Sequence, residues 1–151
     1  MFALTDRNSL LIFNPGQPGV INSVRFITGL GQGENVVGID FRPANGQLYG
    51  VTTANRIYII NPFTGAATPV GSAPLNPAVN GQLFGLDFNP VPDLIRLTSD
   101  GDQNLRINPN TAVVVTTAPQ DMPLSFAAGD ANAGQNPNIV GSAYTNNFAG
   151  S

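Results

Sequence analysis

The chain repeats itself at an interval of 47 residues and then of 46 or 47, and this periodicity restricts its fold more than any other feature. The sequence GIDF at residues 38–41 returns as GLDF at residues 85–88, and a looser copy, GSAY, begins at Gly141 after a longer loop. Apolar runs that end in Asn-Pro recur at residues 14, 61 and 108. The sequence therefore uses one structural unit several times.

Each unit contains four short runs rich in β-branched and aromatic residues, separated by turns of Gly, Pro and Asn. In the second unit these runs cover residues 36–41, 47–53, 56–60 and 66–71. The 13 Pro and 17 Gly leave no segment with an unbroken 3.6-residue apolar period, which excludes long helices. Four antiparallel strands in about 40–50 residues are typical of a β-propeller blade.

These units predict an all-β chain of the β-propeller type, with one domain over residues 1–151 and three four-stranded antiparallel blades. Blade 1 begins with residues 2–28, blade 2 covers residues 36–71 and blade 3 covers residues 83–117. Residues 139–146 predict one further innermost strand. The chain is thus expected to begin with the second strand of its first blade and to end with a single innermost strand. We expect this last strand to complete a first blade, as in propellers that close by strand exchange.

Three blades are fewer than the four to eight of closed propellers, and an open blade face exposes apolar side chains worth about 1.5–3 kcal/mol each. Either the chain is a fragment of a longer propeller, or several copies join. In the second case residues 139–145 of one chain pair with residues 2–5 of the next, which gives a closed six-bladed ring from two chains or an open filament. The residues expected at this contact are Ile139, Val140, Tyr144, Phe2 and Leu4.

The stretches ALTDRNSLLIFN, GIDFRPANGQLYGVT and GDANAGQNPNIVGSAYTNN resemble a bacterial family of secreted, β-propeller-like repeat proteins that is classed as a domain of unknown function. The resemblance covers essentially the whole chain. It implies the propeller fold and a location outside the cell or in the cell envelope of a bacterium. It brings no activity, no catalytic residue and no particular small ligand.

The composition excludes several classes of function. The chain contains no His and no Cys, which removes a Ser-His-Asp triad, disulfides and zinc sites built on these residues. A net charge of −3, with six Arg and no Lys, provides no basic face for nucleic acid. No apolar run approaches the 18 residues of a membrane span. We therefore expect no enzyme, no cofactor and no nucleic-acid partner, and we expect the chain to associate with itself.

The main candidate binding site contains Asp40 and Asp87, which occupy the same place in two repeats, with Arg42 close by. A ring of carboxylates at the mouth of a channel would suit a hard cation such as Ca²⁺. The series is broken by Ala143 in the last copy. An aspartate that recurs once per blade also suits local hydrogen bonding to its own turn, so both interpretations stay open.

Asp100 and Asp102 resemble the first ligands of a calcium loop and are weak metal candidates. Leu105 stands where such a loop needs Gly, and no Glu follows at the twelfth position, which favours a polar hairpin. The long segment 118–138 either carries function or only reaches to the last strand. We also expect the arginines of the repeats to pair with aspartates: Arg42, Arg96 and Arg106 with Asp40, Asp87 or Asp93.

Three functions follow from these patterns. The first is a non-enzymatic, self-assembling structural repeat protein. The second is an extracellular propeller that binds a ligand or a glycan. The third is a metal-dependent hydrolase that uses the channel aspartates, and the absence of His and the single Glu weigh against it.

Overall fold

The computed structural model describes residues 1–117 and 121–151, which form three antiparallel sheets and no helix. The first sheet contains β1 (Phe2–Leu4), β2 (Ser9–Phe13) and β3 (Ile21–Phe26). The second contains β4 (Val36–Phe41), β5 (Leu48–Thr52), β6 (Ile57–Ile60) and β7 (Ala67–Val70). The third contains β8 (Phe84–Asn89), β9 (Leu94–Ser99), β10 (Asn104–Asn108) and β11 (Val113–Val114). Within these residues, no helix is available to cross a membrane.

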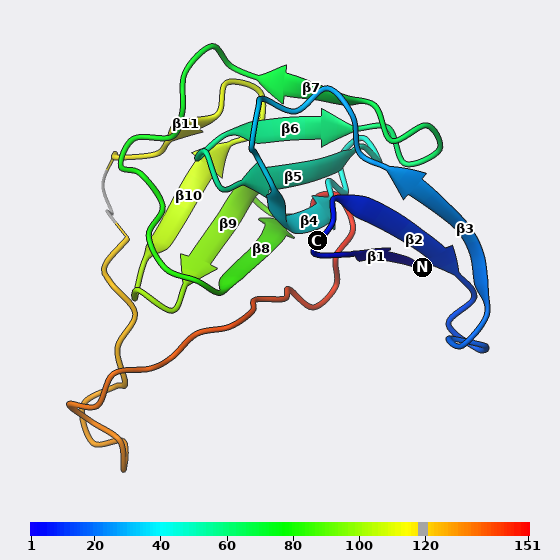
Figure 1. Ribbon diagram of the computed structural model, residues 1–151. Coiled ribbons are helices and arrows are strands. Elements are labelled where there is room, and N and C mark those ends of the chain that lie inside the picture. The colour runs from blue at the N-terminus through cyan, green and yellow to red at the C-terminus, as the bar shows by residue number, and fades with distance from the viewer. Residues whose placement is uncertain (118–120) are drawn as a thin grey trace.

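The sheets follow one another in an arc, with β1, β4 and β8 on its inner side and β3, β7 and β11 on its outer side (Figure 1). Each sheet is a meander, because its strands pair in chain order. The predicted all-β class and the antiparallel sheets are therefore confirmed. The structure shows an open arc of sheets and not a closed propeller.

The predicted four-stranded first blade is wrong for the single chain, because the first sheet has three strands. Residues 139–146 form no strand and do not pair with β1. They lie instead beside β8, where a Cβ atom built on Gly85 would come within 2.5 Å of the backbone nitrogen of Ser142. Within residues 1–117 and 121–151, no strand pairs with the inner edge of β1.

The hairpin turn between the second and third strands recurs every 47 residues in the three sheets. Asn8, Asn55 and Asp102, which are spaced by 47, all adopt left-handed backbone conformations with φ of 52°, 59° and 63°. Short polar residues adopt this region more readily than other non-glycine residues, so the hairpin between the second and third strand of each repeat keeps its shape. The cross-strand pairs agree with this spacing: Phe2 with Ile12, Tyr49 with Ile59 and Arg96 with Arg106.

Two hydrophobic cores lie between the sheets. The core between the first and second sheets contains Leu10, Ile27, Val36, Leu48, Tyr58 and Ile60. The core between the second and third sheets contains Tyr49, Val51, Ile57, Phe88, Ile95, Leu97 and Ile107, among others. All residues of β5 are buried, because the second sheet is covered on both faces. The three sheets are therefore held together face to face, as blades are.

Candidate functional site

Asp40 and Asp87 lie on the inner strands β4 and β8, which pack against each other. Oδ2 of Asp40 accepts a hydrogen bond of 2.9 Å from the backbone N–H of Phe88. Oδ2 of Asp87 accepts a hydrogen bond from the backbone N–H of Tyr144. Each aspartate therefore binds the backbone of the next repeat, a linking role that neither sequence interpretation included.

The two carboxyl groups also contact each other. Burial, and a hydrogen bond that the protonated Asp40 side chain donates to Asp87, raise the pKa of Asp40 from 3.8 to about 7, although the N–H of Phe88 opposes the shift. Asp40 thus keeps its proton up to near neutral pH. Ala143 stands at the third position of the series, and the residues that the structure describes contain no group of three acidic, His or Cys side chains that could hold a metal ion.

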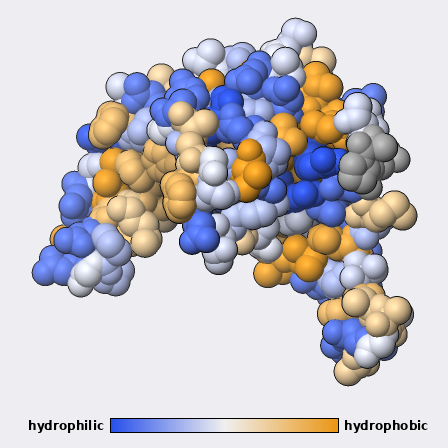
Figure 2. Space-filling view, turned by 180° about the vertical axis from the view of Figure 1, so that it is seen from behind, coloured by the Kyte–Doolittle hydropathy of each residue, from blue (hydrophilic) through white to orange (hydrophobic). Residues whose placement is uncertain are grey.

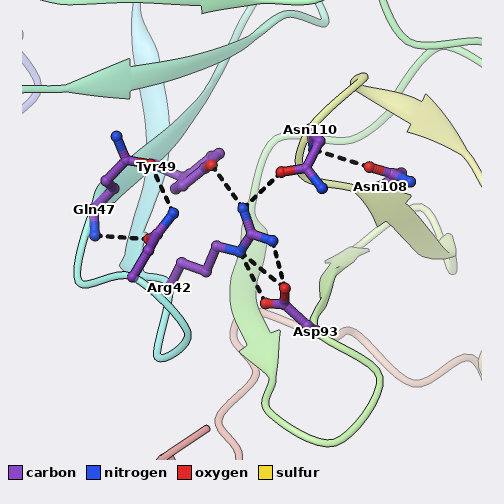
Figure 3. A network of polar contacts seen from close by, with 7 residues as sticks. Arg42, Gln47, Tyr49, Asp93, Asn108 and Asn110 are labelled. Atoms are coloured by element: carbon purple, nitrogen blue, oxygen red, sulfur yellow. Dashed lines mark hydrogen bonds and ion pairs between the residues drawn. The ribbon is translucent and has the colours of Figure 1, made fainter.

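Arg42 follows β4 and bridges the second and third sheets (Figure 3). Its Nε donates to both carboxylate oxygens of Asp93, at 2.9 and 3.1 Å. Its Nη1 donates to the hydroxyl of Tyr49 at 3.3 Å and to Oδ1 of Asn110 at 2.8 Å. Asp93 and Tyr49 hold the pKa of Arg42 above its ordinary range. The predicted pairing of Arg42 with Asp93 is confirmed, and it leaves this guanidinium group engaged within the protein.

We expect the substitution Arg42→Met to lower the free energy of unfolding by about 1–3 kcal/mol, because it leaves Asp93 without its bidentate partner. The loss is smaller than for a fully buried pair, since the Asp93 side chain is 34% exposed. Urea denaturation measures the change. The matched control is Arg7→Met at an exposed arginine, and equal losses in the two variants would contradict the bridging role.

A second polar cluster lies on the outward face of the third sheet. Nη1 of Arg96 lies 2.9 Å from Oδ1 of Asp121, and Nε of Arg106 lies 2.6 Å from Oδ2 of the same carboxylate. Burial opposes ionisation of Asp121, but the two arginines outweigh it and lower its pKa. The prediction that Arg96 and Arg106 pair with Asp40, Asp87 or Asp93 was wrong, since their partner comes from the irregular segment after β11.

This outward face is covered by the chain itself. Nδ2 of Asn104 donates to the carbonyl of Met122 at 3.3 Å, and the N–H of Leu124 donates to the carbonyl of Asp102 at 2.9 Å. The positions that carry Arg96 and Arg106 in the third repeat carry apolar or aromatic residues in the other two: Phe2, Ile12, Tyr49 and Ile59. The third sheet therefore presents a polar outer face, unlike the apolar faces between the sheets.

The weak metal candidates have structural contacts. Oδ1 of Asp100 accepts hydrogen bonds from the N–H groups of Gln82 at 2.8 Å and Leu83 at 3.3 Å. Asp102 adopts the left-handed conformation of its turn. These contacts suit the interpretation as a polar hairpin, which they attach to the segment before β8. Part of the long segment 118–138, residues 118–120, lies outside the described residues.

The residues predicted at the assembly contact come from both ends of the chain and meet at the inner side of the arc. Leu4 and Val140 line one cavity together with Val36 and Phe84. Val140 is 62% exposed there. Figure 2 shows the molecule hollowed on this side, with hydrophobic atoms gathered beside the hollow. The structure thus brings the two predicted edges close together without pairing them.

These features define an all-β repeat protein with three antiparallel sheets, a 47-residue period and carboxylate links between the inner strands. A family model described as "Domain of unknown function (DUF4394)" matches residues 9–151, so the chain belongs to this family. No curated protein and no solved structure matches the chain. The description of the family contains no activity.

Proposed function

We propose that this chain is a non-enzymatic structural protein that assembles with copies of itself through the edges of β-propeller-type sheets, outside the cell or in the cell envelope of a bacterium. One observation carries the proposal. The N–H of Tyr144 binds Asp87 in the same way as the N–H of Phe88 in β8 binds Asp40. The segment around Tyr144 therefore lies where a further inner strand would follow β8. Among the residues that the structure describes, this segment pairs with no further strands, and the first sheet has three strands where the other two have four.

The two deficits complement each other. An unpaired sheet edge is a template for a strand of another chain. Two chains of three sheets would give six blades, within the usual range for a closed ring, and an interface that does not close would give a filament. Such assembly would also cover apolar side chains that are exposed near the edges, including Met1 and Val140.

The polar groups of the candidate site support a structural role. The side-chain oxygens of Asp40 and Asp87 bind the backbone of the next repeat, and the guanidinium group of Arg42 is held by Asp93. Groups that are already paired within the fold are less available to a substrate than open ones. The outer face of the third sheet carries charged side chains and offers little apolar area to a second copy. Association should therefore depend on pairing of residues 139–146 more than on packing of whole sheet faces.

The test is the particle mass of the purified chain by light scattering, together with negative-stain microscopy. We expect twice the mass of one chain for a ring, or extended filaments. Deletion of residues 139–151 should yield monomers, whereas deletion of residues 148–151 alone should leave assembly intact. A full-length chain that stays monomeric at all accessible concentrations would overturn the proposal.

A further inference from the structure

The inner strands follow one another with a fixed contact. A Cβ atom on Gly38 of β4 would lie 3.1 Å from Cβ of Leu86, the residue that follows Gly85 in β8. A Cβ atom on Gly85 would in turn lie 2.5 Å from the backbone nitrogen of Ser142, the residue that follows Gly141. A side chain at Gly85 would collide with the backbone of the next segment, and one at Gly38 would press tightly on Leu86, so Gly suits this place in both repeats.

Gly141 is the third residue in this series, and its neighbour is missing. Nothing in the described part of the chain lies within 4 Å of a Cβ atom built on it. In this series each Gly meets the residue after the Gly of the next copy: Gly38 meets Leu86, and Gly85 meets Ser142. In the repeat that contains Gly38, the equivalent residue is Ile39. Ile39 lines a cavity of about 470 Å³ with Met1, Phe2, Asp40, Phe41 and Leu48, between β1 and β4. An unfilled contact thus exists at each end of the arc.

The backbone of β1 points toward the same cavity. The hydrogen bonds from Phe13 N–H to the carbonyl of Met1 and from Thr5 N–H to the carbonyl of Ser9 attach the residues that flank β1 to β2. Adjacent residues of an antiparallel strand direct their N–H and C=O groups to opposite sides. The peptide groups of Phe2 and Leu4 therefore face the open edge, where an inner strand would pair.

The repeat defines the register of that pairing. In the second sheet Asp40 pairs with Tyr49, and in the third sheet Asp87 pairs with Arg96. Phe2 stands 47 residues before Tyr49, and Ala143 stands in place of the aspartate. The equivalent pair between copies is therefore Ala143 with Phe2. Gly38 pairs with Val51 in the second sheet, so the next pair on the same face is Gly141 with Leu4.

We propose that residues 139–146 of a second copy of this chain occupy the groove between β1 and β4, with Ala143 opposite Phe2 and Gly141 against Ile39. The inference rests on the proposed assembly and adds the occupant, its register and the residue that permits its approach. The occupant is a second copy because the same segment lies along β8 of its own chain and leaves its pairing edge free. A single chain cannot satisfy both contacts in the arrangement observed.

The first test is the substitution Gly141→Val. The free chain has room for this side chain, so circular dichroism and thermal unfolding of the dilute protein should not change. In the assembly the side chain would meet Ile39 of the second copy, and we expect the dissociation constant to rise at least about tenfold. The matched control is Gly19→Val, at an exposed glycine with equally open surroundings, which should assemble like the unmodified protein.

The second test measures the register by cross-linking. Because the chain has no cysteine, a chain with Ala3→Cys can be mixed with a chain carrying Ser142→Cys, and only a disulfide between copies can join them. These two positions lie opposite each other in the proposed register. The control pairs Ala3→Cys with Ala143→Cys, where a shift of one residue turns the side chain to the other face. We expect the first mixture to form the covalent dimer faster under mild oxidation.

The outcomes separate the two proposals. Assembly that is unaffected by Gly141→Val, or that cross-links equally well in both mixtures, would overturn the docking inference while leaving self-assembly in place. An unmodified chain that remains monomeric would overturn the proposed function and the docking inference together. Faster cross-linking of the Ala3 and Ser142 positions, with weaker association of the Gly141 variant, would support both.

Discussion

The substitution Phe88→Ala is expected to lower the free energy of unfolding by about 3–5 kcal/mol. Phe88 is fully buried between the second and third sheets. Its ring lies 5.1 Å from the ring of Tyr49 in an edge-to-face arrangement, which adds to the loss of buried area. The backbone N–H that binds Asp40 remains in the variant, so the change reports on packing between the sheets rather than on the carboxylate link.

Denaturation in urea, followed by circular dichroism, measures this effect. The matched control is Phe63→Ala, at a ring that is 74% exposed and should cost little. A loss of less than about 1 kcal/mol for Phe88→Ala would contradict a packed core between these sheets. A loss of similar size in both variants would show that the method does not distinguish the core from the surface.

The sequence predicted the sheets because their signals are local. Asn-Gly at residues 45–46 and the Asn-Pro turns mark where strands end, and the four runs expected in the second unit match β4 to β7 closely. The turn residues repeat in conformation as well as in sequence, as Asn8 and Asn55 show. Features that depend on neighbouring residues and on a repeated period can therefore be predicted from one sequence.

The contacts that organise the candidate site are not local. The hydrogen bond from Phe88 to Asp40 depends on how closely β8 approaches β4, which the spacing of the repeats does not specify. Asp121 lies in an irregular segment without a counterpart in the other repeats, so no pattern marked it as the partner of Arg96 and Arg106. The position of residues 139–146 similarly depends on which edge is free, and in this chain they lie along β8 rather than along β1.

The aspartate pair has a further consequence, which is the dependence of stability on pH. The pKa of Asp40 is about 7 in the folded chain and close to its ordinary value of 3.8 in the unfolded chain. Between these values the folded state binds a proton that the unfolded state releases. The free energy of unfolding should therefore fall as the pH rises from about 4 to about 7, and should then level off. The lowered pKa of Asp121 acts in the opposite direction, and only at the acidic end of this range and below.

The substitution Asp40→Asn should remove this pH dependence. The amide oxygen can still accept the N–H of Phe88, and the amide N–H₂ can donate to Asp87, without a charge that has to be buried. At pH 8 we expect the variant to be more stable than the unmodified chain by about 1–3 kcal/mol, since partial exposure of the carboxyl group reduces the full effect of the shift. Urea denaturation at pH 5 and pH 8 measures both slopes, with Asp6→Asn at an exposed carboxylate as the control. A variant that is less stable than the unmodified chain at both pH values would mean that Asp40 holds the next repeat as a carboxylate, and not as the protonated partner of Asp87.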